Sequence, residues 1–213
     1  MSDEKRFAIE AARKARVEAL RTRMSAELAG VTGVVLEIGC GHGHFLAAYS
    51  AAHPAVFCLG LDLISKRIER ALRKRDRANL ANLTFIKADA FELLEALPDK
   101  TQLQAIFLIF PDPWPKMRHH KNRLIQPGLL DRLAELSTPE HTRLHFRTDH
   151  DGYFSWAHSL LAQHPAWHLL PEEIWPFEHE TFFSQRLPIH HSLIAKRQER
   201  ASLLQTPADS PAK

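Results

Sequence analysis

The chain has 213 residues, of which 45% are hydrophobic and 25% charged, a composition typical of one globular, soluble domain with a sizeable core. No apolar run approaches the roughly 20 residues needed to cross a membrane, and residues 1–30 lack the apolar centre of a signal peptide. We therefore expect a cytoplasmic protein with no membrane partner. The net charge of +3 is too small to identify a nucleic-acid partner by itself.

The distribution of basic residues is more informative than their sum. Lys and Arg cluster in three segments, Lys5 to Arg23, Lys66 to Arg77 and Lys116 to Arg123. The 14 histidines show no spacing typical of metal ligands, so we expect no metal. Cys40 and Cys58 both lie in apolar runs, which predicts buried, reduced thiols.

The chain divides into three predicted parts. Residues 1–30 form a basic amphipathic helix, residues 31–198 the main domain, and residues 199–213 a disordered tail rich in Ala, Ser, Pro and Gln. Short apolar runs predict strands at Val34–Ile38, Val56–Leu63, Leu83–Ala88, Ala105–Phe110, Arg143–Thr148, Trp167–Leu170 and Ile189–Ala195. Helices are predicted at Phe7–Leu28, His42–Ala52, Ser65–Arg77 with Ser65 as the cap, from Pro127, and at Tyr153–Gln163. Strands alternating with helices indicate an α/β fold whose mostly parallel sheet is covered on both faces.

The first strand ends in a glycine-rich loop. Glu37 precedes Gly39, Gly41 and Gly43, and this alternation differs from the dinucleotide-binding pattern, whose last glycine comes three residues after the second. A phosphate-binding loop would avoid a carboxylate at position 37. An acid there suits the cationic amino end of an amino-acid-bearing ligand, whereas an ordinary glycine turn would need no such residue.

The next two strands also end in acids. Asp62 follows the glycine loop by roughly twenty residues, the spacing at which an acid binds ribose hydroxyls in nucleotide-binding folds. Asp89 ends the third strand, where it could hold an adenine amino group. Either acid alone would more often be a solvated loop residue or a helix cap. Acids at three consecutive strand ends favour a common ligand, because such ends meet at one edge of a parallel sheet.

This pattern, from Val34 to about Ala90, resembles the class I S-adenosylmethionine-dependent methyltransferases. The resemblance implies a Rossmann-like methyltransferase fold and S-adenosylmethionine as cofactor, without identifying a substrate. A more specific motif follows the fourth strand, where Pro111-Asp112-Pro113-Trp114-Pro115-Lys116 leads into a basic segment. Together with Thr148-Asp149 and the late Thr181 segment, this motif resembles the bacterial transfer RNA (guanine-N7-)-methyltransferase family, which methylates guanine 46 in the variable loop. The resemblance covers about residues 34–196.

The family resemblance also assigns roles by position. Its cofactor residues fall on Glu37, Gly39, Gly41, Asp62, Asp89 and Asp112, and its substrate contacts on Lys116, Arg118, Asp149, Thr181 and Ser184. Two departures affect substrate handling. The family usually has Thr-x-x-Glu where this chain has Thr181-Phe182-Phe183-Ser184, so a guanine-edge acceptor is either missing or supplied by Glu178 or Glu180. The family's arginine-glycine N-terminal stretch is replaced by the basic helix.

These residues define a hypothesis for the chemistry. Asp112 is interpreted as the catalytic residue, acting by orientation and electrostatics, because guanine N7 carries no proton for a base to remove. Lys116, Arg118, Lys121 and Arg123 are expected to bind phosphates of transfer RNA, while Trp114 either stacks on a base or packs in a loop. Alternatives are a methyltransferase for another RNA position or a small molecule, and a non-catalytic RNA-binding protein. The sequence leaves open a monomer or a homodimer.

Overall fold

A computed structural model of the chain describes residues 2–179 and 189–199. Within these residues the chain forms a seven-stranded sheet in the order β3-β2-β1-β4-β5-β7-β6. All neighbouring strands run parallel except at β7, which is antiparallel to both β5 and β6. The strands are β1 (Gly33–Ile38), β2 (Phe57–Asp62), β3 (Leu83–Lys87), β4 (Gln102–Ile109), β5 (Arg143–Thr148), β6 (Trp167–Leu169) and β7 (His191–Arg197). The predicted α/β fold with a mostly parallel sheet is confirmed.

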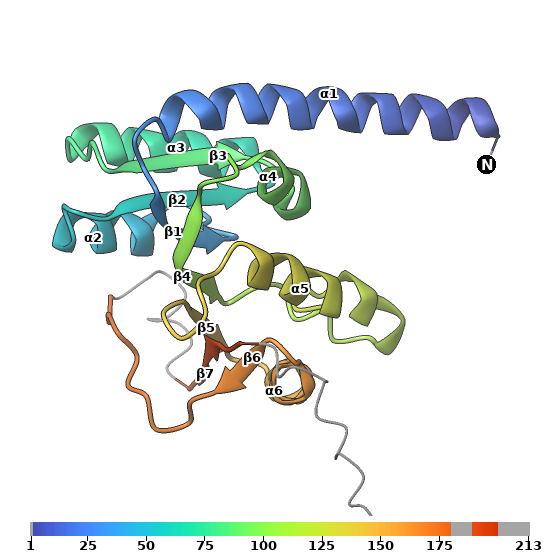
Figure 1. Cartoon of the computed structure of the whole chain (residues 1–213). Helices are drawn as coiled ribbons and strands as arrows, with labels where there is room; N and C mark the ends of the chain where they lie inside the picture. The colour runs from blue at the N-terminus through green and yellow to red at the C-terminus, as the bar shows by residue number, and fades with distance from the viewer. Residues whose placement is uncertain (1, 180–188, 200–213) are drawn as a thin grey trace, which may run out of the picture.

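Helices cover both faces of the sheet (Figure 1). One face packs against α2 (His44–Ala52) and α3 (Ser65–Arg77), and the other against α4 (Ala90–Ala96), α5 (Pro127–Glu135), α6 (Asp151–Gln163) and the end of α1 (Asp3–Glu27). A short 3-10 helix, η1 (Met117–Asn122), lies between β4 and α5. Because both faces are covered, the central strands read as continuous apolar runs, and five of the six residues of β1 are buried.

The strand order reverses direction between β1 and β4. From β1 the chain adds β2 and then β3 on one side, and β4 and then β5 on the other. At such a switch point the loops after the two central strands diverge to opposite faces, which leaves room for a ligand at their carboxyl ends. The loops that follow β1, β2, β3 and β4 therefore frame the candidate site.

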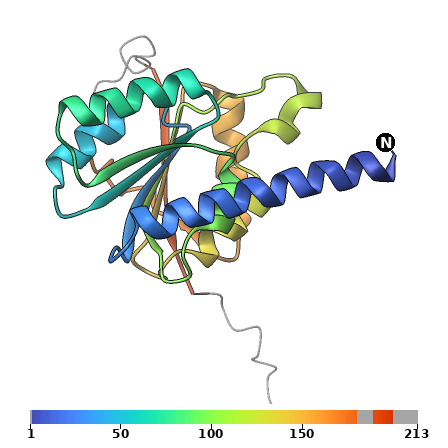
Figure 2. The ribbon, with the colours of Figure 1, turned by 90° about the horizontal axis from the view of Figure 1, so that it is seen from above.

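Helix α1 is docked at one end only. Val17, Met24 and Leu28 are buried against the rest of the molecule, whereas almost every residue before Val17 is exposed. The first turns of α1 project beyond the sheet in both views of the ribbon (Figures 1 and 2). The division of the chain into a helix, a domain and a tail stays a prediction, and residues 200–213 of the predicted tail lie outside the described residues.

Several local predictions differ from the structure. Ser65 is the first helical residue of α3 and not its cap, because the N-cap is Ile64 and no side chain caps that end. Helix α4 and the 3-10 helix η1 were not predicted. In the described part of the chain, no helix is long and apolar enough to span a bilayer.

Candidate functional site

The glycine loop after β1 adopts a conformation that requires its glycines. Gly39, Gly41 and Gly43 all have positive φ, of 81°, 54° and 65°, a region that side-chain-bearing residues adopt at a cost. A Cβ at Gly39 or Gly41 would meet no atom within 4 Å. The loop is therefore bordered by open space on the side where a ligand backbone or sugar would approach.

Glu37 is buried at the end of β1 with an incomplete set of hydrogen bonds. Its side chain is 4% exposed, and its Oε2 atom has no hydrogen-bond partner among the described residues. Burial is the main cause that raises the pKa of this carboxyl from 4.5 to about 8; a backbone hydrogen bond at Leu46 opposes the rise, and the nearby carboxylate of Asp62 contributes to it. An unpartnered buried carboxyl oxygen costs free energy, and a cationic amino group would satisfy it.

Asp62, at the end of β2, holds the glycine loop. Its Oδ2 accepts from the backbone N–H of Gly41 at 3.1 Å and from Arg67 at 3.3 Å, and its Oδ1 accepts from the N–H of Ile64 at 2.8 Å. A carboxylate has about four acceptor positions, so three are in use. The predicted two-hydroxyl grip on a ribose therefore requires Arg67, the longest of the three contacts, to move aside.

Asp89 is both a helix cap and a pocket residue. Its Oδ1 accepts from the N–H groups of Phe91 and Glu92, and so caps α4. The cap uses Oδ1 alone, and Asp89 is exposed to solvent. It lines a pocket at the ends of β2 and β3 together with Leu63 and Ala88, and α1 supplies the remaining side of that pocket.

The turn after β4 is strained at both ends. Phe110 and Trp114 have φ of 49° and 43°, values that are rare for bulky residues and that cluster at functional sites. Asp112 lies between them and is exposed. Pro111 and Pro113 fix the intervening backbone, and the N–H of Phe110 donates to the carbonyl of Arg147 in β5 at 2.8 Å. The turn thus presents Asp112 rigidly at the same sheet edge as Glu37 and Asp62.

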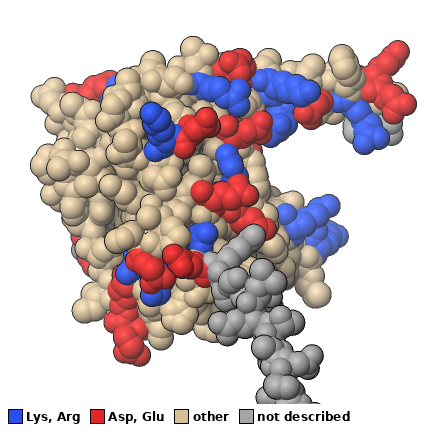
Figure 3. Space-filling view, in the orientation of Figure 1, with Lys and Arg blue, Asp and Glu red and all other residues tan. Residues whose placement is uncertain are grey.

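The basic segment after this turn divides into two kinds of residue. Lys116, Arg118 and Lys121 are exposed, as predicted for phosphate contacts, and Figure 3 shows a group of basic side chains there, separate from those along α1. Arg123, in contrast, is buried, so the prediction that it binds a phosphate is wrong. It is 3% exposed, donates to the carbonyls of Pro113 and Gly152, and packs over Tyr153 and Trp156.

Arg123 therefore braces the turn that carries Asp112. Its Nε donates to the carbonyl of Pro113 at 2.9 Å, directly beside Asp112 in the chain.

Trp114 is 37% exposed, with His119 edge-on at 5.8 Å between ring centroids. Neither of its two predicted roles, base stacking or loop packing, is tested by this placement.

The predicted substrate residues beyond β5 are only partly described. Asp149 is exposed and directly follows Thr148 at the end of β5, at the same edge as Asp112. Thr181, Ser184 and Glu180 lie outside the described residues. Glu178, the other acceptor considered in place of the family's glutamate, already accepts two hydrogen bonds from Arg147, at 2.8 and 2.9 Å.

Arg147 itself was missed by the sequence reasoning. It is buried at the end of β5, its guanidinium lies 4.0 Å from the ring centre of Trp175, and its Nε donates to Ser192. The side chains around it form a small aromatic-walled cavity at the carboxyl edge, lined by Phe45, Ile109, Phe110, Arg147, Trp175, Phe177 and His179. The sequence signal for this cavity was the aromatic pair Trp175 and Phe177 on either side of Pro176, in a mostly polar stretch.

No group of three or more potential metal ligands occurs in residues 2–179 and 189–199.

Comparison with known proteins defines the class and then the family. A family model described as "Putative methyltransferase" matches residues 32–187. The aminoglycoside resistance methyltransferase NpmB1 has a similar structure, with a TM-score of 0.55 at 17% identity over 83% of this chain and 93% of that one. The antibiotic-resistance methyltransferase Kmr also has a similar structure, with a TM-score of 0.54 at 20% identity over 85% of this chain and 94% of that one. At such identities these likenesses establish the fold alone, and with the family match they define a class I methyltransferase.

The curated relatives are more specific. The chain is 35% identical over 190 residues to the tRNA (guanine-N(7)-)-methyltransferase of Rhodospirillum rubrum, a match that spans 83% of this chain and 72% of the relative. The enzyme of the same name from Listeria monocytogenes is 38% identical over 129 residues, which are 61% of this chain and 58% of that protein. For the Mycobacterium avium relative, 38% identical over 56% of this chain, the match spans 46% of its length. This chain belongs to the tRNA (guanine-N7-)-methyltransferase family.

Proposed function

We propose that this protein transfers a methyl group from S-adenosylmethionine to N7 of guanine 46 in the variable loop of transfer RNA. The observation that carries the proposal is the strained turn after β4. It presents Asp112 and the exposed basic residues of η1 at the same sheet edge as the glycine loop and Glu37. A methyl transfer requires cofactor and RNA to meet at one point, and this edge brings the candidate cofactor residues next to an exposed basic segment.

The residues at the ends of β1, β2 and β3 fit the proposed cofactor. Glu37 offers an unpartnered carboxyl oxygen to its amino group, and Gly39 and Gly41 leave open space beside the backbone. Asp62 would accept from the ribose, and Asp89 has a carboxyl oxygen outside the α4 cap for the adenine amino group. When bound, S-adenosylmethionine supplies an electrophilic methyl group on a sulfonium centre.

The protein's part in the chemistry is positioning. Guanine N7 has an exposed lone pair and no proton, so no general base is needed, and the barrier depends on bringing N7 in line with the methyl group. Positive charge moves onto the purine as the bond forms, and a carboxylate fixed beside it stabilises that charge. The backbone that carries Asp112 is held by the proline-rich turn and by the hydrogen bond from Arg123 to the carbonyl of Pro113, which limits the rearrangement that this role needs.

Substrate contacts follow from exposure. Lys116, Arg118 and Lys121 would bind backbone phosphates and so position the RNA without reading its sequence. Asp149, at the end of β5, would accept from the N1–H and amino group of guanine, together with residues of the Thr181 to Ser184 segment. Acidic acceptors at this edge distinguish guanine from adenine, which lacks the N1–H donor.

The decisive test is incubation of the protein with labelled S-adenosylmethionine and unmodified transfer RNA, followed by nucleoside analysis. We expect 7-methylguanosine, and its loss when guanine 46 is replaced by adenine. A methyl group on another atom or position would refute the proposed specificity while leaving the methyltransferase class intact. The absence of any transfer to RNA, in a chain that binds the cofactor, would refute the substrate.

A further inference from the structure

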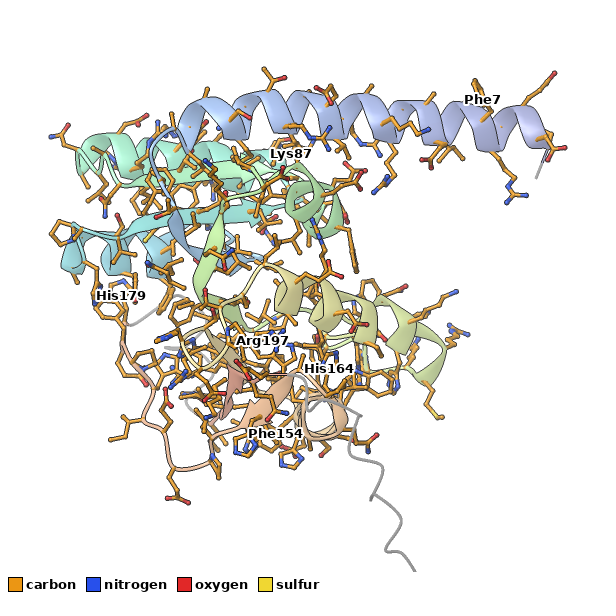
Figure 4. All side chains as sticks on the ribbon, in the orientation of Figure 1. Phe7, Lys87, Phe154, His164, His179 and Arg197 are labelled. Atoms are coloured by element: carbon orange, nitrogen blue, oxygen red, sulfur yellow. The ribbon has the colours of Figure 1, made fainter. Side chains whose placement is uncertain are left out.

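The pocket at the ends of β2 and β3 has one wall made by α1. Arg16, Ala19, Leu20 and Arg23 line it, at the i, i+3, i+4 and i+7 spacing of a single helical face. The opposite lining comes from the strand ends and the first turn of α4, and consists of Leu63, Lys87, Ala88, Asp89 and Glu92. In Figure 4, Lys87 lies beneath the docked half of α1, while Phe7 is on the projecting end of that helix. The docked half of α1 therefore borders the pocket.

Ion pairs to α4 hold α1 over this pocket. The guanidinium of Arg16 makes three hydrogen bonds to the carboxylate of Glu92, at 2.5, 2.9 and 3.2 Å. Arg13, about one turn earlier in α1, pairs with Glu95, about one turn later in α4. Hydrogen bonds from Arg16 lower the pKa of Glu92. Later in α1, Met24 is fully buried in the main core. The docked half of α1 is thus fixed relative to the strand ends.

We propose that α1 forms part of the cofactor site, as the wall against which the adenosine end of S-adenosylmethionine packs. The inference rests on the proposed function, because the same pocket contains Asp89, assigned there to the adenine amino group. Leu20 from α1 and Leu63 from the end of β2 supply apolar surface from two sides, and Leu63 is 66% exposed in the absence of a ligand. A flat apolar ring would cover both side chains.

The charges of the pocket also suit adenine. The guanidinium of Arg16 is planar and can lie against an aromatic ring, and its pairing with Glu92 offsets its charge near a cationic cofactor. The basic N-terminal helix, whose role the sequence left open, is therefore a cofactor-binding element along its docked half. Deleting or displacing α1 would open the adenosine end of the site to solvent.

The test compares ligand binding to the full chain and three variants by calorimetry, with S-adenosylhomocysteine and adenosine as probes. Ala19→Trp places an indole in the pocket from an exposed helical position, and Leu20→Ala removes apolar contact. Ser25→Trp is the matched control, since Ser25 is exposed on α1 but does not line the pocket. We expect Kd for both probes to rise about tenfold or more in the first two variants, with the control within about twofold.

The outcomes separate this inference from the proposed function. Binding of neither probe by the parent chain would refute the cofactor itself. Parent-like affinity in Ala19→Trp and Leu20→Ala, with normal melting temperatures, would leave the cofactor in place and refute the role of α1. A loss confined to S-adenosylhomocysteine would also overturn it, because the contact belongs to adenosine. Weakened transfer RNA binding with unchanged probe binding would assign the pocket to RNA instead.

Discussion

The backbone N–H of Gly41 donates to Oδ2 of Asp62 at 3.1 Å, so the carboxylate proposed to bind ribose also fixes the glycine loop. The two residues are 21 positions apart, and the hydrogen bond joins the loops that follow β1 and β2. Asp62 also accepts from the N–H of Ile64 in its own loop. Cofactor affinity and the shape of the loop therefore depend on one side chain.

The first prediction concerns this shared role. We expect Asp62→Ala to weaken S-adenosylmethionine binding by about 1.5–3 kcal/mol, as for the loss of hydrogen bonds to a charged group, and to lower the melting temperature because the N–H groups of Gly41 and Ile64 lose their acceptor. Calorimetry and thermal unfolding measure the two effects. Asp99→Ala, an exposed acid before β4 at the far end of the sheet, is the control. Unchanged affinity in a folded Asp62→Ala protein would place the ribose elsewhere.

The second prediction links pH to stability through Glu37. Burial raises the pKa of its carboxyl from 4.5 to about 8, so between these pH values the unfolded chain has released a proton that the folded chain still holds. The free energy of unfolding of the ligand-free protein therefore falls as pH rises through this window, by up to about 1.4 kcal/mol per pH unit. Glu37→Gln has no proton to release. We expect the melting temperature of Glu37→Gln, relative to that of the parent, to rise from pH 4.5 to pH 8. A difference in melting temperature that stays constant over this range would contradict the prediction.

The third prediction is that cofactor binding releases the proton held by the carboxyl of Glu37. A cationic amino group beside Glu37 would lower the pKa of its carboxyl, so binding near pH 7 should release a proton from the protein. Calorimetry in two buffers of different ionisation enthalpy measures this release directly. We expect it in the parent chain and not in Glu37→Gln, which should also bind more weakly. Equal proton release by the two proteins would mean that Glu37 does not face the amino group.

The cofactor side of the site was predictable because its residues follow strands. Glu37, Asp62 and Asp89 each come directly after or at the end of a short apolar run, and parallel strands bring such positions to one edge without further information. The parallel sheet itself followed from the alternation of strands and helices. Helix α4 was missed because it has only seven residues and begins immediately after Asp89.

The remaining features depend on contacts between distant segments. Arg123 reads as one more basic residue of its segment, and only the packing of α6, which brings Tyr153 and Trp156 against it, shows that it is buried. The position of α1 over the pocket could not be predicted from the sequence either. An amphipathic pattern indicates which face of a helix is buried but not which part of the molecule that face contacts.

The fourth prediction uses the exposure of the basic segment. Replacing Lys116, Arg118 or Lys121 by Ala should weaken transfer RNA binding and reduce the slope of log affinity against log salt by about one unit or slightly less per lost phosphate contact. Cofactor affinity should not change. Lys100→Ala, an exposed lysine before β4 at the opposite end of the sheet, serves as the control. If the salt slope is unaltered in all three variants, RNA binds by another face, such as the basic helix α3.

The last prediction concerns Asp112, whose exposed side chain lies between the two strained residues of the turn after β4. Asp112→Asn keeps the shape and one acceptor but removes the charge, whereas Asp112→Ala removes both. If the carboxylate stabilises the positive charge that develops on the purine, turnover should fall strongly in Asp112→Ala and less, but clearly, in Asp112→Asn. Transfer RNA affinity should change little, while cofactor affinity falls if Asp112 also contacts the cofactor.

Single-turnover rates at saturating cofactor and RNA separate chemistry from binding. A general base would have to be ionised to act, and the rate would then follow the titration of that base. Guanine N7 has no proton to remove, so we expect the rate to depend on pH in the same way in the parent and in Asp112→Asn. Methylation by Asp112→Asn at the parent rate would refute the electrostatic role. Asp112 would then serve only to shape the turn between Phe110 and Trp114, a role in which an amide replaces a carboxylate without loss.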